Sequence, residues 1–75
     1  MLDIARLILR EREAAGFSQQ ELANRSGVSR ITLARLETGR ANPSVDVLER
    51  IASGFGKELR LSFELADRRD EEAQS

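Results

Sequence analysis

Residues 18–39 read SQQELANRSGVSRITLARLETG and predict two short helices separated by a tight turn. Ser18 is a favourable N-cap, and Glu21 follows three residues later, which is the spacing of a capping box. Gly27 can end the first helix, because glycine adopts a positive φ without steric cost. Ser29 can then cap the second helix.

The second of these helices, which Gly39 is expected to end, has two distinct faces. Leu33 and Leu36 are three residues apart and are expected to face the core. Arg30 and Arg35 then lie on the outer side. Two short helices around a glycine turn, with arginines along the second, are typical of a helix-turn-helix, which places its second helix in the major groove of DNA.

Helices are also predicted on both sides of this pair. Upstream, apolar residues at helical spacing predict a helix that begins at residue 2 or 3 and ends at Ala15, before Gly16. Downstream, Ser44 is the expected N-cap of another helix, which Gly54 and Gly56 would end. The apolar stripe of that helix consists of Val45, Leu48, Ile51, Ala52 and Phe55.

From about residue 12 to residue 55, the sequence resembles the phage repressor and Cro-type helix-turn-helix family, also called the xenobiotic-response-element family. The resemblance implies a mainly α fold, in which a repressor-like domain of four to five helices binds DNA. The residues that carry it are Arg12, Gly16, Ser18-Gln19, Leu22-Ala23, Gly27-Val28-Ser29, Glu37-x-Gly39, Asn42-Pro43 and Leu48.

The exposed side of the second helix and the resemblance together indicate which residues contact DNA. Arg30, Thr32 and Arg35 are expected to read base edges, although Thr32 could instead only support the helix. Ile31 either packs on a thymine methyl or merely shields the turn. The residues expected to contact the DNA backbone are Gln19, Ser29, Thr38 and Arg40. The alternative interpretation makes these side chains ordinary solvated surface.

Glu37 is an unusual residue for a helix that faces DNA, because phosphates repel a carboxylate. The resemblance implies that Glu37 pairs with Arg12 across the core. Such a structural ion pair would hold the first helix against the helix that carries Arg30 and Arg35. The alternative is a loose surface pair, which would contribute little to stability.

The charges are distributed unevenly along the chain, whose net charge is −1. Between Arg25 and Arg40, four arginines and one acid give a local charge of +3. From Leu61 onward, two arginines and five acids give −3. The local potential matters more for DNA binding than the total charge, so the basic region remains compatible with DNA.

The composition also excludes several classes of function. The chain has no histidine, cysteine, tyrosine or tryptophan and no glycine-rich phosphate loop, so no enzyme, no cofactor and no metal site is predicted. No apolar run is long enough to span a membrane. Acidic residues in the N-terminal segment argue against a cleaved targeting peptide. One small domain in the cytoplasm, associated with the nucleoid when bound to DNA, is therefore expected.

Beyond the helices, the apolar residues alternate with polar ones, which predicts a strand with one buried face. The alternating apolar residues are Leu59, Leu61, Phe63 and Leu65. Because the chain offers no second strand, we expect the strand to pair with its copy across a two-fold axis. The expected organisation is a DNA-binding domain over residues 1–56, a dimerisation strand over 57–66 and a disordered acidic tail over 67–75.

A C-terminal strand after such a domain is similar to the HipB-type antitoxins, which dimerise in this way and repress their own operons. The sequence therefore predicts a homodimeric repressor that binds a near-palindromic operator, with its recognition helices about 34–36 Å apart. An antitoxin would also bind a cognate toxin protein. The alternatives are a stand-alone phage-like regulator and a protein-interaction module without DNA binding.

Overall fold

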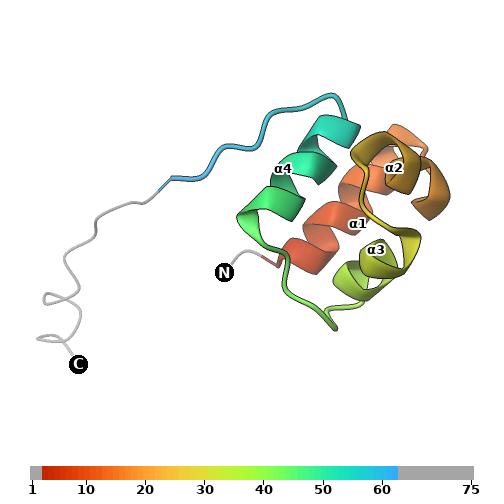
Figure 1. Ribbon diagram of the computed structural model, residues 1–75, viewed down its shortest axis with the longest axis horizontal. Coiled ribbons are helices and arrows are strands. Elements are labelled where there is room, and N and C mark those ends of the chain that lie inside the picture. The colour runs from red at the N-terminus through yellow and green to blue at the C-terminus, as the bar shows by residue number, and fades with distance from the viewer. Residues whose placement is uncertain (1–2, 63–75) are drawn as a thin grey trace, which may run out of the picture.

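Four helices make up the folded part of the computed structural model, which describes residues 3–62 (Figure 1). The helices are α1 (Ile4–Ala15), α2 (Gln19–Ser26), α3 (Arg30–Glu37) and α4 (Val45–Gly54). The prediction of a mainly helical fold is therefore confirmed, and within residues 3–62 no strand forms. None of the helices in this part is long and apolar enough to cross a bilayer.

Side-chain caps set where the helices begin. Asp3 accepts a hydrogen bond from the backbone N–H of Arg6, so α1 begins at Ile4. The predicted start was residue 2 or 3, so the observed start is one or two residues later. Ser18 and Glu21 form the predicted capping box, with bonds of 3.0 and 3.1 Å. Each of these caps satisfies backbone N–H groups that the first turn leaves without helical partners.

Gly54 has a different role from the predicted helix stop. It is the last residue of α4 and has no positive φ, whereas Gly56 has a φ of 72°. A Cβ atom on Gly54 would lie 3.0 Å from Cβ of Ser26 and 3.2 Å from Cδ1 of Leu22. Gly54 therefore lets α4 approach α2 closely, while Gly56 provides the left-handed residue after the helix.

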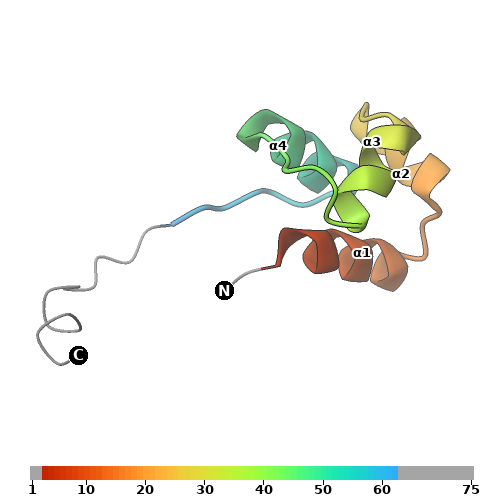
Figure 2. The same cartoon turned by 90° about the horizontal axis from the view of Figure 1, so that it is seen from below.

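The hydrophobic core lies where the four helices meet. α2 packs on α4 and on α3, and α1 packs on α3. Figure 2 shows α1 lying across one side of the other three helices. The buried apolar residues that form this core are Ile8, Leu22, Ala23, Val28, Leu33, Leu36 and Ile51. The core thus holds the helix-turn-helix pair, α2 and α3, against α1 and α4.

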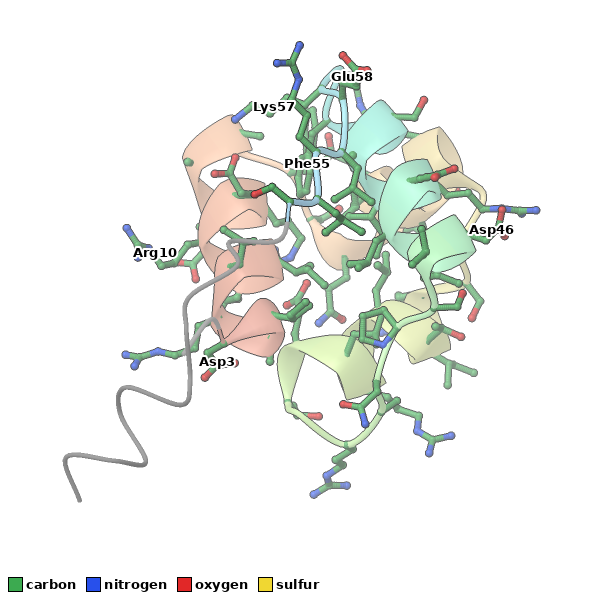
Figure 3. All side chains as sticks on the ribbon, turned by 90° about the vertical axis from the view of Figure 1, so that its left-hand side faces the viewer. Asp3, Arg10, Asp46, Phe55, Lys57 and Glu58 are labelled. Carbon is green, nitrogen blue, oxygen red and sulfur yellow. The ribbon has the colours of Figure 1, made fainter. Side chains whose placement is uncertain are left out.

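The segment after α4 leaves the domain as an extended chain (Figure 1). Figure 3 shows Lys57 and Glu58 at the end of the domain opposite Asp3. Nζ of Lys57 donates to Oε2 of Glu11 at 2.6 Å, which holds the start of the segment against α1.

Only part of the predicted dimerisation strand lies within the described residues. Leu59 and Leu61 are in extended chain without strand pairing, and Leu61 is 63% exposed. This agrees with a physical requirement, because a strand needs a second strand to satisfy its backbone groups. Phe63, Leu65 and the predicted acidic tail over 67–75 lie outside the described residues.

Candidate nucleic-acid interface

Two leucines fix the orientation of α3. Leu33 and Leu36 are buried in the core, so the opposite side of α3 faces solvent. Arg30, Ile31 and Arg35 are exposed there. The first turn of α3 contains no acidic residue. This leaves a basic helical surface that protein does not cover within the described residues.

A shallow groove runs along this side of α3 and continues beyond its end. The structure brings base-reading candidates Arg30, Ile31 and Arg35 together with Thr38 and Arg40, two of the candidates for backbone contact. The residues that line this α3 groove are Arg30, Ile31, Ala34, Arg35, Thr38 and Arg40. Three arginines thus line the groove together with an apolar strip formed by Ile31 and Ala34.

Hydroxyl groups near the groove already bond to the protein. Oγ of Ser29 accepts from the backbone N–H of Thr32 at 3.1 Å and donates to Oγ1 of Thr32 at 2.8 Å. Oγ1 of Thr38 donates to the carbonyls of Ala34 and Arg35 at 3.0 and 3.2 Å. Ser29 therefore acts as the helix cap, and a phosphate contact through either hydroxyl must accommodate these bonds.

Arg25 does not belong to the α3 groove, although the charge count along the sequence includes it. Its guanidinium lies over the ring of Phe17, 4.3 Å from the ring centroid. Phe17 in turn stacks on Phe55, with 6.3 Å between the ring centroids. The cation–π contact thus joins α2 to the α1–α2 connection, and the stacked rings join that connection to the end of α4. The basic surface therefore depends on Arg30, Arg35 and Arg40.

Glu37 is turned away from the groove and toward α1. Its Oε2 accepts from Nε of Arg12 at 2.8 Å, and its Oε1 accepts from Nη2 of Arg12 at 2.9 Å. The side chains of Arg12 and Glu37 are 15% and 4% exposed. The hydrogen bonds that Arg12 donates to the carboxylate of Glu37 raise the pKa of Arg12 above its ordinary value. The pair therefore removes the one acid of α3 from the surface that would face phosphates.

Two further bonds connect this ion pair to the α1–α2 connection and to α2, and neither could be inferred from the sequence. Nη1 of Arg12 donates to the backbone carbonyl of Phe17 at 2.8 Å, just before α2. Nε2 of Gln19 donates to Oε1 of Glu37 at 3.3 Å. Gln19, a candidate for phosphate contact, thus lies at the first position of α2, and its side-chain amide is hydrogen-bonded to Glu37.

Comparison with known proteins identifies this arrangement. Residues 8–61 match the helix-turn-helix family HTH_3, the Cro/C1 type. The chain belongs to this family. The resemblance seen in the sequence is thereby confirmed, and the match to this helix-turn-helix family covers all of α2 and α3. No solved structure matches the chain significantly.

Several curated relatives of this helix-turn-helix family are similar to the chain. An uncharacterised HTH-type transcriptional regulator of Methanothermobacter thermautotrophicus is 46% identical over 69% of the chain and 75% of the relative. An uncharacterised HTH-type transcriptional regulator of Mycobacterium tuberculosis is 47% identical over 73% of the chain, but the match spans only 36% of that relative. The competence pilus inhibition repressor of Acinetobacter baylyi is 34% identical over 95% of the chain and 64% of the relative.

Proposed function

We propose that this chain is a sequence-specific DNA-binding transcriptional repressor. The observation that carries the proposal is the α3 groove, which Arg30, Arg35 and Arg40 line together with the apolar strip of Ile31 and Ala34. Glu37, the only acid of α3, pairs with Arg12 instead of facing solvent. A helix with this combination of donors and no exposed acid is suited to the acceptor-rich major groove and to the phosphates beside it.

The proposal divides the α3 surface and its neighbours into two roles. Arg30, Thr32 and Arg35 read base edges, and Ile31 contributes an apolar contact. The residues that hold the DNA backbone are Gln19, Ser29, Thr38 and Arg40. Arg40 is the strongest of these, because an exposed guanidinium beyond the end of α3 can neutralise a phosphate.

A second copy completes the proposed repressor. In this proposal, residues 57–66 pair with the same segment of the partner, which places the two α3 helices about 34–36 Å apart on a near-palindrome. The exposed position of Leu61 supports this, since dimerisation would cover an apolar side chain that is open in the single chain.

Repression would follow from a bound dimer that blocks the polymerase. The similarity to a protein named as a repressor supports this direction of regulation. The narrower role that we propose is the antitoxin of a toxin–antitoxin operon, with a toxin as the second protein partner. Co-purification of the tagged chain with the product of the neighbouring gene tests the antitoxin role separately from repression.

A band-shift titration tests DNA binding itself, with the promoter of the chain's own gene as the probe. Binding should weaken steeply between 50 and 200 mM salt, by about tenfold or more, because phosphate contacts release counterions. Arg50→Ala is a suitable control, because Arg50 lies on α4 and pairs with Asp46. A protein-interaction module would show no such salt-dependent shift, and that result would reject the proposed function.

A further inference from the structure

Ile31 is the most exposed large apolar side chain among residues 3–62, with 69% of its surface open. It is not part of the hydrophobic core or of the partly buried residues packed against it. The side chain of Ile31 therefore does not contribute to the core. A single exposed apolar residue is common on protein surfaces, so its position decides whether it has a function.

The position of Ile31 is at the N-terminal end of α3, directly after Arg30. In helix-turn-helix complexes the first residues of the recognition helix are those that contact base edges. The side chain of Ile31 offers neither a donor nor an acceptor, so it cannot read the hydrogen-bonding pattern of a base. The apolar feature on the major-groove edge of a base pair is the 5-methyl group of a pyrimidine.

We infer that Ile31 is a specificity-determining residue that recognises the 5-methyl group of a pyrimidine in each half-site. The inference rests on the proposed DNA-binding function. Ala34, which also lines the α3 groove, extends the apolar strip by one helical turn. Removal of water from the methyl group and from this strip provides the free energy of recognition.

Arg35 predicts a second recognised base in the same half-site. Ile31 and Arg35 are four residues apart on one face of α3, which corresponds to about 6 Å along the helix axis. Two base steps of about 3.4 Å span a similar distance. The same half-site should therefore place a guanine, read by Arg35 through its O6 and N7 atoms, about two base pairs from the methylated pyrimidine.

The experiment begins with selection of a bound sequence from a random duplex library by the full chain. Duplexes are then compared that carry thymine, uracil, cytosine or 5-methylcytosine at each pyrimidine of the selected site. Replacement of the recognised thymine by uracil should weaken binding about fourfold in one half-site and about fifteenfold in both, because a buried methyl contributes about 0.8 kcal/mol. 5-Methylcytosine should bind more tightly than cytosine at the same position, which shows whether the methyl group or the thymine ring is recognised.

Ile31→Ala tests whether Ile31 itself provides this preference. The variant should bind the thymine and uracil duplexes with nearly equal affinity. Val45→Ala is the matched control, since Val45 is also β-branched, lies in the first turn of α4 and is 53% exposed. Val45→Ala should retain the full preference for the methyl group.

The possible outcomes separate this inference from the proposed function. Equal binding of thymine and uracil duplexes by the wild type would overturn the inference alone, as would an unchanged preference in Ile31→Ala. If the chain binds no duplex in a salt-dependent manner, that result would overturn both the inference and the proposed function.

Discussion

Nε of Arg12 lies 2.8 Å from Oε2 of Glu37, and this contact joins the last turn of α1 to the end of α3. The second oxygen of Glu37 accepts from both Arg12 and Gln19. One carboxylate therefore connects α1, α2 and α3. A shift of α3 relative to α2 would break these bonds, so the pair fixes the orientation of the helix that carries Arg30 and Arg35.

Loss of either partner of this ion pair should destabilise the domain strongly. Arg12→Ala strands the carboxylate of Glu37, which is 4% exposed, and the cost of such a stranded charge is about 3–5 kcal/mol. A domain of this size has roughly 5 kcal/mol of unfolding free energy, so both Arg12→Ala and Glu37→Ala should be largely unfolded without DNA. Thermal melts followed by circular dichroism measure this directly.

Arg50→Ala serves as the control for the ion-pair prediction, because the Arg50–Asp46 pair is exposed and is worth less than about 1 kcal/mol. Operator DNA should restore part of the helical signal of Arg12→Ala, since a ligand that binds only the folded state stabilises it. Melting temperatures of Arg12→Ala and Glu37→Ala near that of Arg50→Ala would contradict the structural role.

Gly54→Ala should also destabilise the domain, although alanine normally favours a helix. The added Cβ would lie 3.0 Å from Cβ of Ser26, so we expect α4 and α2 to shift apart slightly, at a cost of about 1–3 kcal/mol. Ser53→Ala, at the exposed neighbouring position of α4, should have a small effect. Urea denaturation compares the two variants, and equal midpoints would show that the contact between α2 and α4 adapts without cost.

Of the two contacts behind these stability predictions, only one could be predicted from the sequence. The resemblance implied the pairing of Arg12 with Glu37, because both residues stand at positions of a recognised motif. The contact of Gly54 with Ser26 could not be inferred, since it depends on the distance between two helices that are far apart in the chain. Local patterns specify caps and helix faces, whereas helix–helix distances depend on how the whole core packs.

The candidate interface was likewise only partly predictable from the sequence. The spacing of Leu33 and Leu36 in the sequence predicted that Arg30 and Arg35 lie on the outer side of α3, and both arginines are exposed there. The sequence could not show that Arg25 stacks on Phe17 and leaves the basic surface, because a charge count contains no geometry. It also could not show that Gln19 contacts Glu37, since the two residues meet only after α2 and α3 have packed.

Arginines of the α3 groove should differ in what their loss does to DNA binding. Arg30→Ala and Arg35→Ala should each cost about 1–3 kcal/mol on the operator and relax the sequence preference, if each makes two bonds to a guanine. Arg40→Ala should weaken binding to all duplexes by a similar factor and reduce the salt dependence. Competition titrations with specific and random duplexes distinguish these effects.

Arg25→Ala is the control for this series, because its guanidinium stacks on Phe17 outside the α3 groove. It should leave the ratio of specific to random binding unchanged. An unaltered operator preference in the double variant of Arg30 and Arg35 would show that α3 is not the helix that reads bases.

Dimerisation should depend on Leu61, which alternates with polar residues and is 63% exposed in the single chain. Leu61→Glu would place a charge on the apolar face of the proposed paired strands. Each of the two copies then loses the burial of its Leu61, which is worth about 1.5–3 kcal/mol per leucine. The dissociation constant of the dimer should therefore rise about a hundredfold or more. Ser62→Glu, on the polar side of the alternation, should sediment as the wild type does, whereas deletion from Lys57 onward should give a monomer that binds the operator weakly. Analytical ultracentrifugation over a range of concentrations measures all three proteins, and a dimer that survives Leu61→Glu or the deletion would place the interface on another surface.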